Sequence, residues 1–138
     1  MRKHHLLGAI LLCGGLFSCS SEVIQQANYE IIPLPQEIKI STGNFVLNDR
    51  TSIVYPKGND EMQQNANLLA TYIRQMSGKK LKVIDEQITS NVITLTTGLN
   101  TDNAEAYQLK VTPDNIIIRG ASEAGTFYGI QTLRKSLP

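Results

Sequence analysis

Two pairs of adjacent carboxylates are the residues whose types and spacing could perform acid–base chemistry: Asp60–Glu61 and Asp85–Glu86. A carboxyl group acts as a general acid near neutral pH only where its surroundings raise its pKa. Residues 83–87 read as the end of a strand followed by a loop, and neighbouring side chains of an extended chain point to opposite faces. We therefore interpret Asp85–Glu86 as a solvated loop pair. Asp60–Glu61 follow the helix cap Asn59, so they suit the positive N-terminal end of a helix.

Metal-ligating and nucleophilic side chains are few and lie close to the N-terminus. The two histidines are His4 and His5, and the two cysteines are Cys13 and Cys19. The chain after Cys19 therefore has no imidazole for a zinc site or a catalytic triad, and no pair of thiols for a disulfide. The glycines of Gly120–Gly129 match neither common phosphate-binding pattern. We expect no metal site, no cofactor and no catalytic residue in this chain.

Tyr107 and Tyr128 are the aromatic residues that could stack on a sugar ring. The chain has no tryptophan, three phenylalanines and five tyrosines, which leaves little material for a sugar-binding platform. Tyrosine more often packs in a core or an interface. We interpret both residues as packing residues.

The N-terminus has the pattern of an export signal. Basic residues 2–5 precede apolar residues 6–17, a run of about a dozen residues where a membrane-spanning helix needs roughly 20. Leu16–Cys19 resembles the lipobox of bacterial lipoproteins, in which a peptidase cuts before a lipid-modified cysteine. We therefore predict a signal peptide over residues 1–18 and a lipid anchor on Cys19. An ordinary signal peptide with a chance cysteine is the alternative.

The polar residues that follow suit a tether between lipid and domain. We assign residues 19–28 to this tether and residues 29–138 to one folded domain. Ser20 is not the aspartate that retains lipoproteins in the inner membrane. We therefore expect an exported protein anchored through its lipid to a bacterial membrane, the outer membrane where the host has one.

The charge balance does not favour nucleic acid as a partner. Loss of 18 residues from 138 leaves 120 and removes Arg2 and Lys3, so the formal net charge changes from +1 to −1. No basic run exceeds Lys79–Lys82. A chain of this length can bury roughly two-thirds of its unfolded surface in one core.

Hydrophobic patterning predicts short strands and two helices. The predicted strands are Ile38–Ile40, Asn44–Leu47, Ser52–Tyr55, Leu81–Ile84, Val92–Thr96, Tyr107–Val111 and Ile116–Arg119. The first helix is predicted from Asn59 to Gly78, and Ser122 caps the second. One face of the first helix would carry Met62, Ala66, Leu69, Ile73 and Met76.

These elements predict an α+β fold with a single mixed, mostly antiparallel β-sheet and two α-helices packed on one face. The strand, helix and strand over residues 52–84 favour a right-handed crossover and one parallel pair. Thr112–Asn115 has proline at its second position and reads as a hairpin turn. Gly125 and Gly129 each cost about 1 kcal/mol relative to alanine inside a helix. We therefore expect another backbone to approach the second helix at both glycines.

Two sequence segments resemble a known family. Phe127–Leu133 resembles the end of the small N-terminal domain of bacterial β-N-acetylhexosaminidases, glycoside hydrolase family 20, and Pro33–Glu37 is similar to its beginning. Together they bracket residues 29–138. The resemblance implies an α+β domain, similar in outline to zinc proteases, that precedes a catalytic barrel. It further implies an exported enzyme that removes terminal N-acetylhexosamine from glycans.

The resemblance also implies that the catalytic barrel is absent from this chain. The family uses an adjacent Asp–Glu pair, in which the glutamate is the general acid and the aspartate orients the substrate's own 2-acetamido nucleophile. That pair lies in a glycine-preceded motif on a barrel strand, which Asp85–Glu86 does not match. We expect this chain alone to be inactive, with the barrel, the glycan bound there, and a membrane as partners. The alternatives are a stand-alone lipoprotein that binds glycan or protein, and the leading domain of another exo-glycosidase family.

Two predicted strands are apolar on both faces. Val92–Ile93 and Ile116–Ile118 do not alternate with polar residues, as strands covered on one side usually do. We infer that the helix-free face of the sheet, or the flank of the closing helix, is built to be covered by the catalytic barrel. The alternative is that local turns and loops cover this face.

Overall fold

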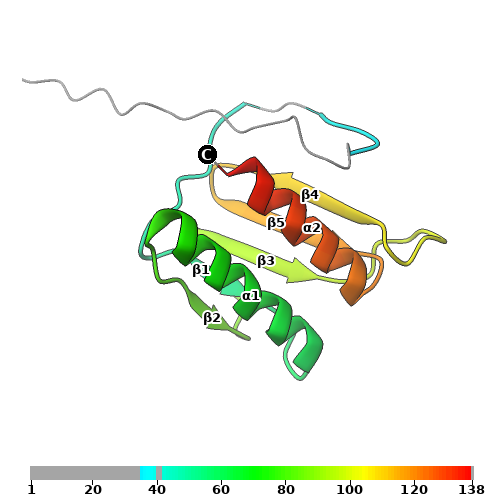
Figure 1. Ribbon diagram of the computed structural model, residues 1–138, viewed down its shortest axis with the longest axis horizontal. Coiled ribbons are helices and arrows are strands. Elements are labelled where there is room, and N and C mark those ends of the chain that lie inside the picture. Colours follow the sequence, from blue (N-terminus) through cyan, green and yellow to red (C-terminus); the bar gives the residue numbers. More distant parts are fainter. Residues whose placement is uncertain (1–34, 40–41, 138) are drawn as a thin grey trace, which may run out of the picture.

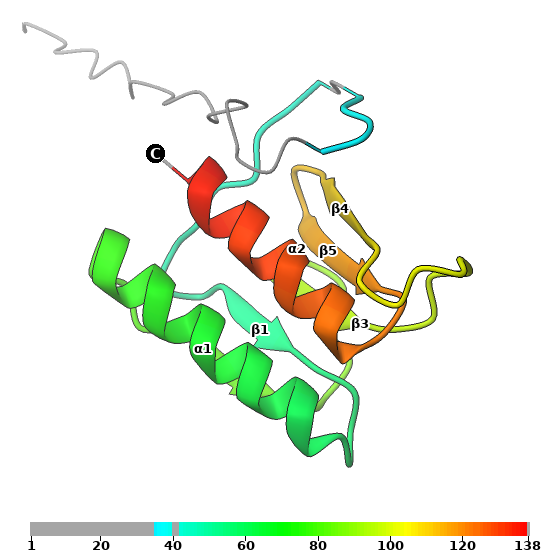
Figure 2. The ribbon, with the colours of Figure 1, turned by 45° about the vertical axis from the view of Figure 1, so that its right-hand side comes forward.

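The computed structural model describes residues 35–39 and 42–137. The elements are β1 (Ser52–Val54), α1 (Asp60–Ser77), β2 (Lys82–Ile84), β3 (Val92–Thr96), β4 (Tyr107–Val111), β5 (Asn115–Gly120) and α2 (Glu123–Ser136). They form a five-stranded sheet in the order β2-β1-β3-β5-β4, with both helices lying side by side on one face (Figures 1 and 2). The predicted signal peptide, the tether and Cys19 lie outside the described residues.

The predicted α+β class, the mixed sheet and the two helices on one face are confirmed, but "mostly antiparallel" is wrong. β1 pairs in parallel with β2 and β3, β3 pairs in parallel with β5, and β4 and β5 form the antiparallel pair. The prediction allowed one parallel pair, because it counted one helical crossover. Residues 85–91 supply another return: a segment of seven residues can reach up to roughly 23 Å, which is more than the length of these strands. The chain therefore re-enters beside β1 in the same direction without a second helix.

The helix caps and the hairpin turn are found where the sequence predicts them. The Asn59 side chain accepts a hydrogen bond from the Met62 amide (2.9 Å), and Gly78 ends α1 in the left-handed region at φ 73°. The Ser122 side chain accepts from the Gly125 amide (3.3 Å). In the hairpin, the Thr112 amide donates to the Asn115 carbonyl (2.8 Å).

Two predicted strands are not found in the described part of the chain. Residues 38–39 and 44–47 have no ladder partner, and Ile40 lies outside the described residues. Phe45 and Leu47 are half-buried against the core, whereas Val46 between them is 66% exposed. The alternation that suggested a strand therefore arises because two side chains anchor an irregular segment.

The core lies between the helices and the near face of the sheet. Its buried members are Ile53, Met62, Ala66, Leu69, Ile73, Ile93, Leu95, Ile116, Ile118, Ile130 and Leu133. Four of the five residues of the predicted α1 stripe are buried, and Met76 is 44% exposed near the end of the helix. The core thus fixes the positions of α1 and α2, and the sides of the helices that face away from the sheet are not part of it.

The two glycines of α2 admit different neighbours. A Cβ atom on Gly125 would lie 2.3 Å from the Ala106 carbonyl oxygen, so another backbone does approach there, as predicted. A Cβ atom on Gly129 would instead lie 2.4 Å from Cγ2 of Ile118, which is a side chain. The prediction of a close backbone is therefore confirmed at Gly125 and wrong at Gly129.

The helix-free face does not leave its central apolar residues open to solvent. Val54 and Val92 are only 2% and 1% exposed, and by strand alternation they point away from the helices. Ile117 on the same face is half-buried. At these positions the chain itself covers the face, which favours the alternative that local segments bury it.

Candidate functional site

The Asp85–Glu86 pair follows the edge strand β2, at the start of the loop over residues 85–91. Asp85 is half-buried and Glu86 is exposed to solvent. A carboxylate in water lacks the apolar surroundings that hold a proton on a general acid. Among the described residues, no group of three histidine, cysteine or acidic side chains could hold a metal ion.

A polar junction joins the N-terminal ends of the two helices. The Asn59 side-chain amide donates to Oε1 of Glu123 (2.9 Å), while its oxygen caps α1. The Asn65 side-chain amide donates to the backbone carbonyl of Glu123 (3.1 Å). The hydrogen bond from Asn59 holds the pKa of the Glu123 carboxyl below its ordinary value, with a backbone hydrogen bond acting in the same direction. Glu123 is therefore a structural anion, the opposite of a general acid.

Further along the helix pair, a cation–aromatic contact joins α1 to α2. The Arg134 guanidinium lies 4.3 Å from the centre of the Tyr72 ring. The Gln131 side-chain amide donates to the Tyr72 hydroxyl (3.5 Å). Tyr72 is half-buried and Arg134 is exposed, so the stack lies at the outer edge of the helix seam.

The two candidate sugar-stacking tyrosines have different environments. Tyr107 is half-buried, and its hydroxyl forms a hydrogen bond of 2.5 Å with the Thr132 hydroxyl, so it packs β4 against α2. Tyr128 is 41% exposed on α2 and forms an edge-on pair with Phe127, with ring centres 5.7 Å apart and planes at 69°. Tyr128 is thus a large aromatic residue that the described core does not use.

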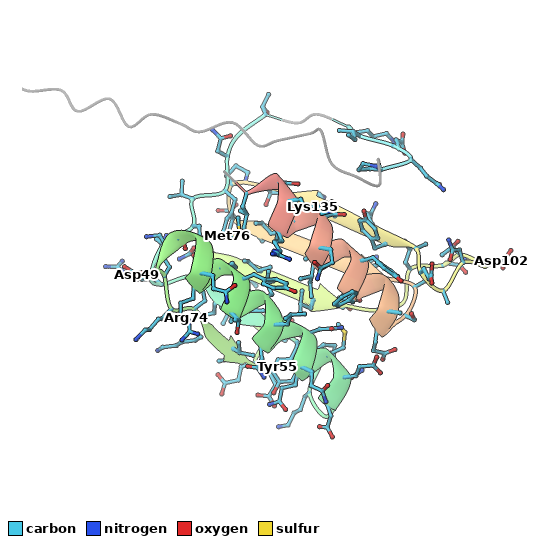
Figure 3. All side chains as sticks on the ribbon, in the orientation of Figure 1. Asp49, Tyr55, Arg74, Met76, Asp102 and Lys135 are labelled. Atoms are coloured by element: carbon cyan, nitrogen blue, oxygen red, sulfur yellow. The ribbon has the colours of Figure 1, made fainter. Side chains whose placement is uncertain are left out.

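A small apolar pocket lies at the opposite end of the helices from the polar junction. It is lined by Leu47, Ile73, Met76, Ser77 and Leu137. Figure 3 shows Met76 and Lys135 near the same end of the helix pair, whereas Asp102 projects from the loop at the opposite end of the sheet. The lining is apolar apart from Ser77, whose hydroxyl already donates to the Ile73 carbonyl (2.7 Å), so the pocket offers little that would orient a sugar.

Sequence patterning found the glycines and caps but missed the contacts across the helix seam. Gln131 and Tyr72 are 59 positions apart, and nothing in either helix alone indicates that the two pair. The available signal was the half-apolar flank of α1 that contains Leu68 and Tyr72. Cys19, the predicted lipid anchor, lies outside the described residues, and no helix within those residues is long and apolar enough to span a membrane.

Comparisons with known proteins by sequence and by structure indicate one and the same family. The family profile described as glycosyl hydrolase family 20, domain 2, matches residues 28–138. A β-hexosaminidase of Porphyromonas gingivalis is 32% identical over 147 residues, which cover 99% of this chain and 18% of that protein.

Two solved structures share the fold. A family 20 β-N-acetylhexosaminidase from Streptomyces coelicolor aligns with a TM-score of 0.72 and 26% identity over 78% of this chain and 21% of its own. A β-hexosaminidase from Streptomyces plicatus aligns with a TM-score of 0.73 and 24% identity over 83% of this chain and 23% of its own.

The chain spans about a fifth of the length of the relatives that it matches. The family match extends over every described helix and strand, and the solved structures share the same arrangement. This chain belongs to glycosyl hydrolase family 20, as its domain 2, the accessory domain that lies outside the catalytic barrel.

Proposed function

We propose that this chain is the N-terminal accessory domain of an exported β-N-acetylhexosaminidase. The complete enzyme would remove terminal N-acetylhexosamine from glycans by substrate-assisted retaining hydrolysis, and the catalytic residues would lie in a barrel beyond this chain. The observation that carries the proposal is the family match over residues 28–138, which is the whole of the described fold. The exposed Glu86 and the ionised Glu123 support the view that the acid chemistry takes place elsewhere.

The domain's role would be mechanical. Its two helices, joined by Asn59, Asn65 and Glu123 at one end, form a preassembled layer that can brace a second domain without rearranging. The tether over residues 19–28 would hold the enzyme at a distance from the membrane. Lipid on Cys19 would anchor it, in the outer membrane where one is present.

Hydrolysis of p-nitrophenyl N-acetylglucosaminide by the 138-residue chain tests where the chemistry resides. We expect no turnover above the buffer background, and Glu86→Gln should behave identically. Hydrolysis that is abolished by Glu86→Gln would refute the proposal, because the active site would then lie within this chain.

Sequencing the gene beyond codon 138 tests the proposed architecture independently. A reading frame that continues into a His-x-Gly-Gly-Asp-Glu type of motif supports the hexosaminidase. A stop codon at that point would instead favour the stand-alone lipoprotein. A continuing frame without this motif would favour another exo-glycosidase family.

The anchor is tested by labelling cells with radioactive palmitate and separating their membranes. The native chain should carry label in the membrane fraction, and Cys19→Ser should carry none. Equal labelling of the two forms would exclude Cys19 as the lipid site, and soluble native chain would support the ordinary signal peptide.

A further inference from the structure

The fold places opposite charges at opposite ends of the sheet. Because β1, β2, β3 and β5 are parallel, the residues that precede them and the last turns of both helices gather at one end. Among residues 42–137, this end has seven cationic and two acidic side chains: Arg50, Arg74, Lys79, Lys80, Lys82, Arg134 and Lys135, with Asp49 and Asp114. The other end has seven acidic and two cationic side chains: Asp60, Glu61, Asp85, Glu86, Asp102, Glu105 and Glu123, with Lys57 and Arg119. Figure 3 shows Asp49 and Arg74 at the first end and Asp102 at the second.

The helix dipoles account for only part of this separation. Three of the seven cations lie in the last turns of the helices, and three of the seven acidic residues lie in the first turns, where they complement the dipoles. The other four residues at each end belong to strands and loops. At the cationic end these four are Arg50, Lys79, Lys80 and Lys82, which we call the basic edge.

The basic edge lies at the starts of two neighbouring strands. Ser52 of β1 pairs with Lys82 of β2, so Arg50 and Lys80, each two residues earlier, lie at adjacent strand starts. Arg50, Lys80 and Lys82 are exposed, and Lys79 is half-buried. In the described part of the chain, none of the four side chains makes an ion pair. The domain therefore supplies no paired counter-charge for this group of cations.

A polar network holds the turn that presents Arg50. The Arg50 amide donates to Oδ1 of Asn48 (2.9 Å), and the Asn48 amide donates to Oγ1 of Thr51 (3.1 Å). The Thr51 hydroxyl donates to Oδ1 of Asn91 (2.7 Å), and the Asn91 side-chain amide donates to Oδ1 of Asn48 (3.0 Å). Asn91 directly precedes β3, so this network fixes the turn to the sheet.

Two exposed apolar side chains lie at the same end of the domain. Val46 is 66% exposed, and its carbonyl accepts a hydrogen bond from the Asn48 side-chain amide (3.2 Å). Met76 is 44% exposed near the end of α1 and lines the apolar pocket together with Leu47. Lysine and arginine beside exposed apolar side chains are the composition of surfaces that bind in the headgroup region of a membrane.

We propose that the basic edge faces the membrane and binds the phosphate groups of anionic lipids, an inference that rests on the proposed lipid anchor. A flexible tether of ten residues has an r.m.s. length of roughly 18 Å, so residues 19–28 would keep the domain near the membrane without fixing its orientation. The negative surface potential of an anionic leaflet attracts lysine and arginine side chains. It would attract the cationic end and repel the acidic end, so one orientation of the anchored domain is favoured.

Vesicle binding by the 138-residue chain tests this assignment. All variants carry Cys19→Ser, which removes any lipid from the protein. The charge-reversal pair is Lys79→Glu with Lys80→Glu. The control pair is Lys57→Glu with Lys110→Glu, which changes the net charge equally and lies away from the basic edge.

The measured quantity is the Kd for two kinds of vesicle. One contains equal parts of phosphatidylglycerol and phosphatidylcholine, and the other contains phosphatidylcholine alone. Residues 1–18 are identical in all variants, so differences between variants report the substituted lysines. Thermal midpoints of both pairs should stay within about 4 °C of the native value, which checks folding.

We expect reversal of Lys79 and Lys80 to weaken binding to the phosphatidylglycerol vesicles about twentyfold or more, since each cation near an anionic surface contributes about fivefold. The control pair should weaken it less than about threefold, because salt screens charges far from the contact. Equal weakening by the two pairs, or no weakening by the first pair, would overturn the assignment. Release of the native chain by inorganic phosphate at a matched phosphate concentration would also overturn it, because the basic edge would then bind a free ion.

Palmitate labelling of Cys19 separates this result from the proposed anchor. A labelled Cys19 together with equal binding of both paired variants would leave the anchor standing and refute the oriented contact. An unlabelled Cys19 would count against the anchor itself. In that case, a selective loss of binding on reversal of Lys79 and Lys80 would still support the basic edge as the lipid contact.

Discussion

Replacing Gly125 by alanine tests how tightly α2 is seated against the loop over residues 97–106. In a free helix this change stabilises by about 1 kcal/mol, because alanine has the higher helix propensity. In this fold the new methyl group would lie 2.3 Å from the Ala106 carbonyl oxygen and 3.1 Å from that of Ala104. Both neighbours are backbone atoms, so a rotamer change cannot relieve the clash. The loop or the helix has to move.

The magnitude follows from two costs and one gain. Overpacking of a closed site costs about 1–3 kcal/mol. The Ala106 carbonyl also accepts a hydrogen bond of 2.8 Å from the Ala121 amide. Displacing this carbonyl costs about 0.5–1.5 kcal/mol more. Against the propensity gain of about 1 kcal/mol, the net loss of unfolding free energy is about 0.5–3.5 kcal/mol.

The assay is reversible urea unfolding of the 138-residue chain followed by circular dichroism. Each kcal/mol should also lower the thermal midpoint by roughly 4–8 °C in a domain of this size. Ala124→Gly is the matched control, because Ala124 is exposed on the same turn and reports propensity without packing. It should lose up to about 1 kcal/mol. A Gly125→Ala chain as stable as the native chain, or more stable, would refute the close approach of the loop.

Three further changes test other contacts of the helices. Glu123→Gln should lower the unfolding free energy near neutral pH and have less effect as the pH falls. A carboxyl group whose pKa is lowered by folding stabilises the fold above the ordinary glutamate pKa, and this stabilisation is lost as the group is protonated. An equal loss of unfolding free energy at about pH 7 and about pH 3 would contradict this. Asn59→Ala removes the α1 cap and should cost about 0.5–2 kcal/mol in urea unfolding, and it should also raise the pKa of Glu123 in a carboxyl titration by NMR; an unchanged titration would show that the junction bond is not formed. Gly129→Ala places a methyl group 2.4 Å from the buried Ile118 side chain. The overpacking cost of about 1–3 kcal/mol should exceed the helix-propensity gain of about 1 kcal/mol. A raised thermal midpoint would rule this out.

The parts of the fold that sequence predicted well are those decided within a few residues. Asn59 and Ser122 cap their helices through the third following amide, and Gly78 supplies the left-handed residue that ends α1. The Thr112–Asn115 turn is closed by its own backbone bond. Each of these features is determined by local hydrogen-bonding chemistry, so no knowledge of the tertiary structure was needed.

The parts that sequence could not supply depend on which distant segments meet. Tyr72 and Arg134 belong to different helices, and their stack exists because both helices start at the same end of the sheet and lie side by side (Figure 1). Gly129 shows the same limit in another form. A glycine inside α2 indicated a close neighbour at that position. Only the register of β5 shows that this neighbour is the Ile118 side chain and not a backbone.

The strand direction was the largest error, and the sequence contained the signal that corrects it. Val92–Ile93 and Ile116–Ile118 are apolar on both faces, which suggested an external partner for the helix-free face. Strands in the centre of a parallel sheet are normally buried on both faces and lose their alternation for that reason alone. The central strands β1, β3 and β5 are parallel neighbours, whereas β4, the antiparallel edge, keeps exposed Gln108 and Lys110 at alternate positions. The missing alternation therefore goes with central strands that are buried within the domain, where Val54 and Val92 are 2% and 1% exposed, and it is no evidence for an external partner on the helix-free face.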